Sequence, residues 1–181
     1  RNWACYHVSD NANGTKAFRL NSNSAGDVSN YWNGTQPTSS VYSVGTETEV
    51  NKSGDSIVAY CWADVEGYSK FGSYTGNGNA DGPFIYTGGQ PSLIAIKRTD
   101  STSGWTVVDT ARYTANTSDG PGRLEWNLTN AETTGSSALR EMDVLSNGVK
   151  IRGTNGNINA SGGNYIYMCW NLVPFKYNNT F

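Results

Sequence analysis

Apolar and polar residues alternate along several short stretches of the chain, a pattern typical of β-strands whose two faces meet different surroundings. The stretch 123–128 places its two leucines and its tryptophan on one face and polar side chains on the other, so we expect a half-buried strand there. The stretches 84–86, 93–98 and 105–109 are rich in β-branched and aromatic residues and are also expected to be strands, with a short turn joining the first two. The pattern predicts an all-β fold.

The dipeptide Asn147-Gly148 gives the strongest turn signal, because both residues tolerate the positive φ angles of a two-residue hairpin turn. It lies between the apolar stretches 142–145 and 149–152, which we expect to pair as antiparallel strands. The Gly- and Tyr-rich stretch 67–78 is expected to add an edge strand, since its aromatic side chains need burial.

Residues 53–62 and 161–170 are copies of each other, separated by 108 positions, and both begin with Ser-Gly and end with Cys-Trp. The longer stretches 56–65 and 164–172 are apolar on both faces, as expected of strands in the centre of a sheet or between packed layers. We therefore expect the chain to be a tandem repeat.

The repeat divides the chain into a first module, residues 1–72, and a second module, residues 73–181, each expected to be a small antiparallel β-sandwich. The first module has no counterpart of the strands expected at 84–86 and 93–98. We expect the missing strands to come from upstream polypeptide, the chain being the C-terminal part of a longer protein, or from a neighbouring subunit by strand addition. Four tryptophans at matched positions of the repeat are expected to fill the two cores: Trp3, Trp62, Trp105 and Trp170.

Composition supports thin sheets with long polar loops. Only 36% of the residues are hydrophobic, while 11 Tyr and 6 Trp favour strands, so almost no helix is expected. With 13 basic and 15 acidic residues and a net charge of -2, the chain has no electrostatic reason to bind nucleic acid. It contains no apolar run of the roughly 20 residues that a membrane-spanning helix needs. We expect neither nucleic acid nor membrane as a partner.

The cysteines and the single histidine argue against a metal centre. Cys61 and Cys169 occupy matched positions of the repeat, whereas Cys5 matches a valine, so a small buried side chain is the expected common requirement. Free thiols are therefore expected, although the spacing of the cysteines alone also allows a disulfide between two of them. The chain has no Cys/His cluster with zinc-ligand spacing, and we expect no metal and no cofactor.

Candidate catalytic groups are weak. Carboxylates two positions apart share one face of a strand, as glycoside hydrolases require, and Glu141-Met-Asp143 is the best such pair. A third acid is missing, because position 146 is Ser, so surface carboxylates on a solvated strand face are the favoured interpretation. His7 is the only histidine, and no nucleophile elbow accompanies it. No catalytic residue is expected, and the chain is expected not to be an enzyme.

Aromatic residues in polar loops are the other candidates for function. Tyr31, Trp32 and Asn33 are consecutive in a loop of Ser, Asn and Gly, and Tyr113 lies in another loop. A loop tryptophan can stack on a sugar ring while neighbouring amides bind hydroxyl groups, but it can also fill a contact within the fold or between subunits. The contact is the favoured alternative.

The segment from Ile57 to Gly78 resembles a domain recurrent in predicted structural proteins of marine tailed phages. The resemblance continues through 79–84, 96–101, 143–148 and 159–162 to 174–176, and so covers most of the chain. It implies a virion appendage or surface protein, located on the virion or outside the cell, and it carries over no catalytic residue. The loop 113–122 departs from the pattern.

Two functions are therefore expected as alternatives. The first is a non-enzymatic virion component, a tail or head fibre subunit for assembly or host attachment. Its partners would be other copies of itself, neighbouring virion proteins and a host surface glycan. The second is a carbohydrate-binding module of a secreted or viral polysaccharide-degrading protein, which would need a sugar-binding groove around Trp32.

Overall fold

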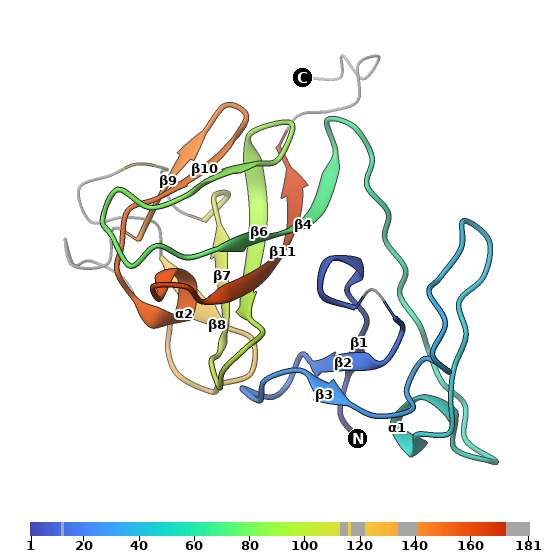
Figure 1. The fold of residues 1–181 in the computed structure, drawn as a ribbon. Helices are drawn as coiled ribbons and strands as arrows, with labels where there is room; N and C mark the ends of the chain where they lie inside the picture. Colours follow the sequence, from blue (N-terminus) through green and yellow to red (C-terminus); the bar gives the residue numbers. More distant parts are fainter. Residues whose placement is uncertain (12, 113–115, 117–121, 134–140, 173–181) are drawn as a thin grey trace.

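The structure is a computed structural model that describes residues 1–11, 13–112, 116, 122–133 and 141–172. It is an all-β protein of antiparallel sheets, which confirms the predicted all-β class, and the described residues include two single-turn α-helices (Figure 1). The elements in chain order are β1 (Ala4–Cys5), the 3-10 turn η1 (Val8–Asp10), β2 (Lys16–Arg19), β3 (Asp27–Val28), α1 (Thr48–Asn51), β4 (Ser69–Thr75), β5 (Phe84–Tyr86), β6 (Pro91–Arg98), β7 (Trp105–Asp109), β8 (Arg123–Glu125), β9 (Met142–Leu145), β10 (Gly148–Ile151), α2 (Gly156–Asn159) and β11 (Asn164–Asn171).

Two packed sheets form the main body of the molecule. One has the strand order β4-β11-β6-β7-β8, and the other has the order β5-β10-β9. β11 lies between β4 and β6 and pairs antiparallel with both. Tyr165, Tyr167 and Cys169 point from β11 into the space between the sheets, whereas Ile166 and Met168 point to the opposite face. Burial of both faces explains why this strand is apolar from Tyr165 to Trp170.

The core between the two sheets is built from alternate residues of the strands, as the period of a β-strand requires. Tyr74 of β4 stacks on Tyr165 of β11 with ring centroids 4.9 Å apart, and its hydroxyl donates to the carbonyl of Ile158. The aliphatic and sulfur-containing members of this core are Ile85, Ile94, Ile96, Val108, Met142, Val144, Val149, Ile151, Ile158 and Cys169.

Several local predictions are confirmed. β9 and β10 pair as the hairpin expected around Asn147-Gly148. The stretch 67–78 supplies the edge strand β4, as expected. One connection differs, because β5 pairs with β10 while β6 pairs with β11 and β7. The chain between β5 and β6 therefore crosses from one sheet to the other instead of making a hairpin. β8 is also shorter than expected, and Trp126 and Leu128 beyond it are exposed.

Residues 1–51 are called here the N-terminal layer, and its first half packs against the outer face of the five-stranded sheet. Phe18 is buried against this face together with Trp105 and Ile166. The indole of Trp105 donates a 2.9 Å hydrogen bond from Nε1 to the carbonyl oxygen of Arg19. His7 lies 3.0 Å through Nε2 from the carbonyl oxygen of Tyr167 in β11. The sheet is thus sandwiched between β5-β10-β9 on one side and the N-terminal layer on the other.

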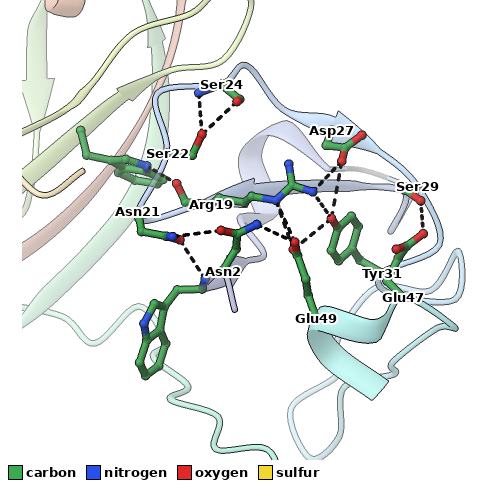
Figure 2. Close-up of polar contacts among 12 residues, drawn as sticks. Asn2, Arg19, Asn21, Ser22, Ser24, Asp27, Ser29, Tyr31, Glu47 and Glu49 are labelled. Atoms are coloured by element: carbon green, nitrogen blue, oxygen red, sulfur yellow. Dashed lines mark hydrogen bonds and ion pairs between the residues drawn. The ribbon is translucent and has the colours of Figure 1, made fainter. Parts of the chain in front are cut away.

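A polar network centred on Arg19 holds this layer together (Figure 2). The guanidinium donates through Nε to Glu49 at 3.1 Å and through a terminal nitrogen to Asp27 at 3.0 Å. Tyr31 donates its hydroxyl to Glu49 at 3.1 Å, and Asn2 donates to the same carboxylate at 2.7 Å. Burial acts to raise the pKa of Glu49, but these hydrogen bonds outweigh it and keep the pKa below its ordinary value. The network ties α1 to β2 and β3.

The expectation of two tandem sandwiches is not confirmed in the part of the chain that the structure describes. Residues 1–51 contribute only the small sheet β1-β2-β3 and two single turns of helix. The stretch 56–65, expected to be a central strand, is not in a strand. The division at residues 72 and 73 stays a prediction, and β4 runs across that position.

Candidate functional site

The residues between α1 and β4 form the most unusual surface of the molecule. Residues 56–64 are called here the connecting segment. They run from the N-terminal layer to the sandwich and belong to no strand (Figure 1). Every residue from 51 to 66 is exposed. Among the described residues, no backbone group pairs with the backbone of the connecting segment. A stretch with the sequence of a buried strand is therefore held open to solvent.

Both ends of the connecting segment are fixed. Arg1 forms an ion pair with Asp55 immediately before it. At the other end, Asp64 forms an ion pair with Lys70 of β4 and accepts a 2.8 Å hydrogen bond from the backbone N–H of Phe71. Ser69 donates its hydroxyl to the carbonyl oxygen of Ala63 at 2.7 Å. These contacts define where the segment starts and ends while its middle stays unpaired.

A row of aromatic rings joins the connecting segment to both parts of the molecule. Tyr60 stacks on Trp3 with centroids 6.3 Å apart and on Trp62 with centroids 6.1 Å apart. Trp62 contacts Trp170 of β11 edge to face at 5.7 Å, and Trp170 contacts Phe71 in the same way at 5.6 Å. We call Trp3, Tyr60, Trp62 and Trp170 the aromatic row. It holds the segment extended, with large ring surfaces toward solvent.

The four tryptophans expected in the cores therefore differ in role. Trp105 is completely buried and Trp170 is partly buried against the outer face of the sheet. Trp3 and Trp62 are 51% and 56% exposed, which corrects the expectation that they are core residues. For Trp62, the physical reason is that the connecting segment lacks the neighbouring strands and covering layers that β11 has. Trp3 precedes β1, outside the small sheet of the N-terminal layer.

Two of the loop aromatics, Tyr31 and Trp32, are turned into the fold and not toward solvent. Tyr31 and Trp32 are buried in a small cluster with Ala17, and the indole of Trp32 donates to the carbonyl oxygen of Lys16 at 2.9 Å. Trp32 is 7% exposed and thus makes a contact within the fold, the favoured alternative, instead of presenting its ring to solvent. Asn33 is exposed at a positive φ of 54°, a turn conformation. Tyr113 lies outside the described residues.

The carboxylate pair expected on a solvated strand face is buried instead. Glu141 accepts 2.6 Å hydrogen bonds from Arg123 and from Asn155. Asp143 accepts a 2.7 Å hydrogen bond from Arg152. Both carboxylates are less than 10% exposed and are engaged by cations, so they are held as structural anions at the junction of β8, β9 and the turn after β10.

His7 is a structural residue. Its Nδ1 accepts from the backbone N–H of Ser9 at 3.3 Å, which leaves the hydrogen on Nε2 to be donated to Tyr167. Burial lowers the pKa of His7, against opposing effects of the Tyr167 carbonyl and of Asp10 and Asp64. A neutral imidazole therefore fastens the N-terminal layer to the centre of the sheet.

The three thiols are free, as expected, but they do not share an environment. Cys169 is buried, Cys5 is half-buried and Cys61 is exposed on the connecting segment. Burial raises the pKa of both Cys5 and Cys169 to about 12, so these two thiols stay protonated. Within the described ranges, no group of three or more His, Cys, Asp or Glu side chains is placed to hold a metal ion.

In the same described ranges, no helix is long and apolar enough to cross a membrane.

The fold and the connecting segment together define an all-β protein with an antiparallel sandwich, a covering N-terminal layer and an exposed apolar segment between them. Residues 1–174 match a family model described as a domain of unknown function, DUF7483. The chain belongs to that family. No curated protein matches the chain, and no solved structure matches it.

Proposed function

We propose that the chain is a non-enzymatic structural protein of a virus particle, a subunit of a tail or head fibre or similar appendage that acts in assembly or host attachment. The observation that carries the proposal is the connecting segment, whose apolar side chains and unpaired backbone are exposed together. Such surfaces invite pairing with another polypeptide, and assembly subunits need them. The resemblance of residues 57–78 to structural proteins of marine tailed phages supports the same function.

The test is to look for the chain in purified particles of the virus that carries its gene. Mass spectrometry should find its peptides at the abundance of a structural protein, and gold-labelled antibodies against the N-terminal layer should mark an appendage in electron micrographs. A chain present in infected cells but missing from washed particles would contradict the proposal.

A second candidate function is carbohydrate binding by the aromatic row. Exposed aromatic rings stack on sugar rings, and Trp3, Tyr60 and Trp62 are each at least half exposed. A glycan array followed by calorimetry on the best hit would test this function. Trp62→Ala should abolish the signal, and the matched control Trp126→Ala, which removes a ring exposed by 39% elsewhere on the surface, should not. An array without hits would remove this candidate.

A further inference from the structure

The connecting segment has the sequence of a central strand but none of the surroundings of one. Its sequence counterpart, β11, is paired on both edges and buried on both faces. By contrast, Ile57, Val58 and Tyr60 are 46%, 60% and 63% exposed. Exposed strand edges and contiguous apolar side chains are the two features that soluble proteins normally cover. The segment is therefore suited to be covered by another strand.

A sugar would cover only part of this surface. A sugar stacked on the aromatic row would cover the ring faces. It would leave the unpaired backbone N–H and C=O groups and the aliphatic side chains of Ile57 and Val58 without partners. A polypeptide strand satisfies all three, because it hydrogen bonds to the backbone and packs its own side chains on both faces. A protein strand is thus the better complement.

The segment is also complementary to itself. Tyr60 and Trp62 already stack on each other, and because every second residue of a β-strand lies on the same face, pairing would place Val58 on that face too. In an antiparallel pair centred on Tyr60, the midpoint of residues 56–64, Val58 lies opposite Trp62 of a second copy, and the two Tyr60 rings lie opposite each other. Aromatic and β-branched pairs of this kind stabilise antiparallel strands.

Charge favours the same arrangement. Asp55 lies immediately before the segment, and Asp64 is its last residue. A parallel pair in register would set Asp64 directly against Asp64 of the second copy, which is destabilising. The antiparallel pair centred on Tyr60 instead sets Asp64 against Ser56 and Asp55 against Val65. No two like charges then lie opposite each other.

We propose that two copies of the chain associate through their connecting segments, which pair as antiparallel strands across a twofold axis at Tyr60. The interface is isologous, because each copy contributes the same residues. The inference rests on the proposed function and deepens it by naming the partner and the contact. Its failure would leave the particle experiment above unaffected, because a fibre subunit can also assemble through a different protein.

Sedimentation equilibrium on the full chain over a concentration series tests the association. A dimer of twice the 19.6 kDa chain mass is expected at the upper concentrations. Val58→Asp should weaken it by at least about tenfold, because it sets a carboxylate against Trp62 of the second copy in an apolar contact. The matched control is Val41→Asp, because Val41 is 64% exposed but lies in a different loop. It should leave the dimer unchanged.

The register has its own test. Tyr60→Cys on a Cys61→Ser background should form a covalent dimer under mild oxidation, since residues opposite each other at the twofold axis bring their Cβ atoms within reach of a disulfide. Far-ultraviolet circular dichroism should show that each variant keeps the wild-type fold. A chain that stays monomeric at every concentration, or a dimer that Val58→Asp and Val41→Asp affect equally, would overturn the proposal, and so would glycan binding by a strictly monomeric chain.

Discussion

Replacing Trp105 by alanine should destabilise the protein far more than replacing Trp62, although the repeat gives both residues the appearance of core tryptophans. Trp105 is completely buried where the N-terminal layer meets the five-stranded sheet. Removing a buried tryptophan ring costs about 3–5 kcal/mol through lost burial and the cavity that remains. Its hydrogen bond to the Arg19 carbonyl adds about 1 kcal/mol. We expect a loss of about 4 kcal/mol or more.

Trp62 offers a matched comparison. More than half of its surface is exposed, and its main identified contact is the edge-to-face ring pair with Trp170. Such a pair contributes about 0.5–1.5 kcal/mol, so Trp62→Ala should cost about 1 kcal/mol.

The assay is urea unfolding followed by far-ultraviolet circular dichroism, at a protein concentration low enough to keep the chain monomeric. With a slope of about 2.5 kcal/mol per molar urea, Trp105→Ala should lower the midpoint by about 1.5 M and Trp62→Ala by less than about 0.5 M. If Trp105→Ala does not accumulate in folded form, Trp105→Phe provides the measurement, with an expected loss of about 1–3 kcal/mol. Equal midpoint shifts for Trp105 and Trp62 would refute the packing described here.

Three further variants test the charged and polar groups. Lys97 is fully buried, and desolvation together with Arg98 lowers its pKa to about 8 despite Asp100. Lys97→Met removes the cost of burying this charge, about 3 kcal/mol, but also the 2.8 Å hydrogen bond to the carbonyl oxygen of Arg98, so it should stabilise the protein by about 2 kcal/mol at pH 7. The pKa of Lys97 is lower in the folded state than in the unfolded state, so the wild-type protein becomes more stable as pH rises from about 8 to 10.5. The difference in urea midpoint between Lys97→Met and the wild type should therefore shrink over this range. Burial also lowers the pKa of His7. What its neutral form contributes to the free energy of unfolding is therefore lost as pH falls below about 6.5, and His7→Gln should reduce the loss of thermal stability between pH 7 and pH 5. Glu49→Gln should cost about 1–2 kcal/mol at pH 7 by calorimetry, whereas Glu66→Gln at an exposed site should cost almost nothing.

The strands of the sandwich could be predicted because their sequences carry local signals. The Asn147-Gly148 turn fixes the β9 and β10 hairpin, and apolar residues on both faces of β11 favour a central position in a sheet. The change of sheet between β5 and β6 could not be predicted, because a short turn between two strands is compatible with a hairpin and with a crossover. Strand pairing is a long-range property that local patterns leave open.

The connecting segment shows the opposite case, in which nearly the same sequence has two structures. Residues 53–62 repeat 161–170, yet only the second copy forms a strand, because pairing partners and covering layers decide whether an apolar stretch becomes one. The buried position of Trp32 agrees with the favoured contact within the fold, but its polar neighbours in sequence gave no sign that Ala17 and Lys16 are its partners. The charged anchors Glu141 and Asp143 could not be recognised without the arginines that reach them from other strands.

Hydrogen exchange measured by mass spectrometry tests the central claim most directly, because peptides from residues 56–64 and from β11 report on the two sequence copies in one experiment. In dilute monomer, the backbone amides of 56–64 should exchange almost as fast as those of an unfolded chain, while those of β11 should be protected by hydrogen bonds to β4 and β6. At concentrations that favour the dimer, residues 56–64 should become protected while β11 stays unchanged. Strong protection of 56–64 at all concentrations, or none at any, would contradict the account.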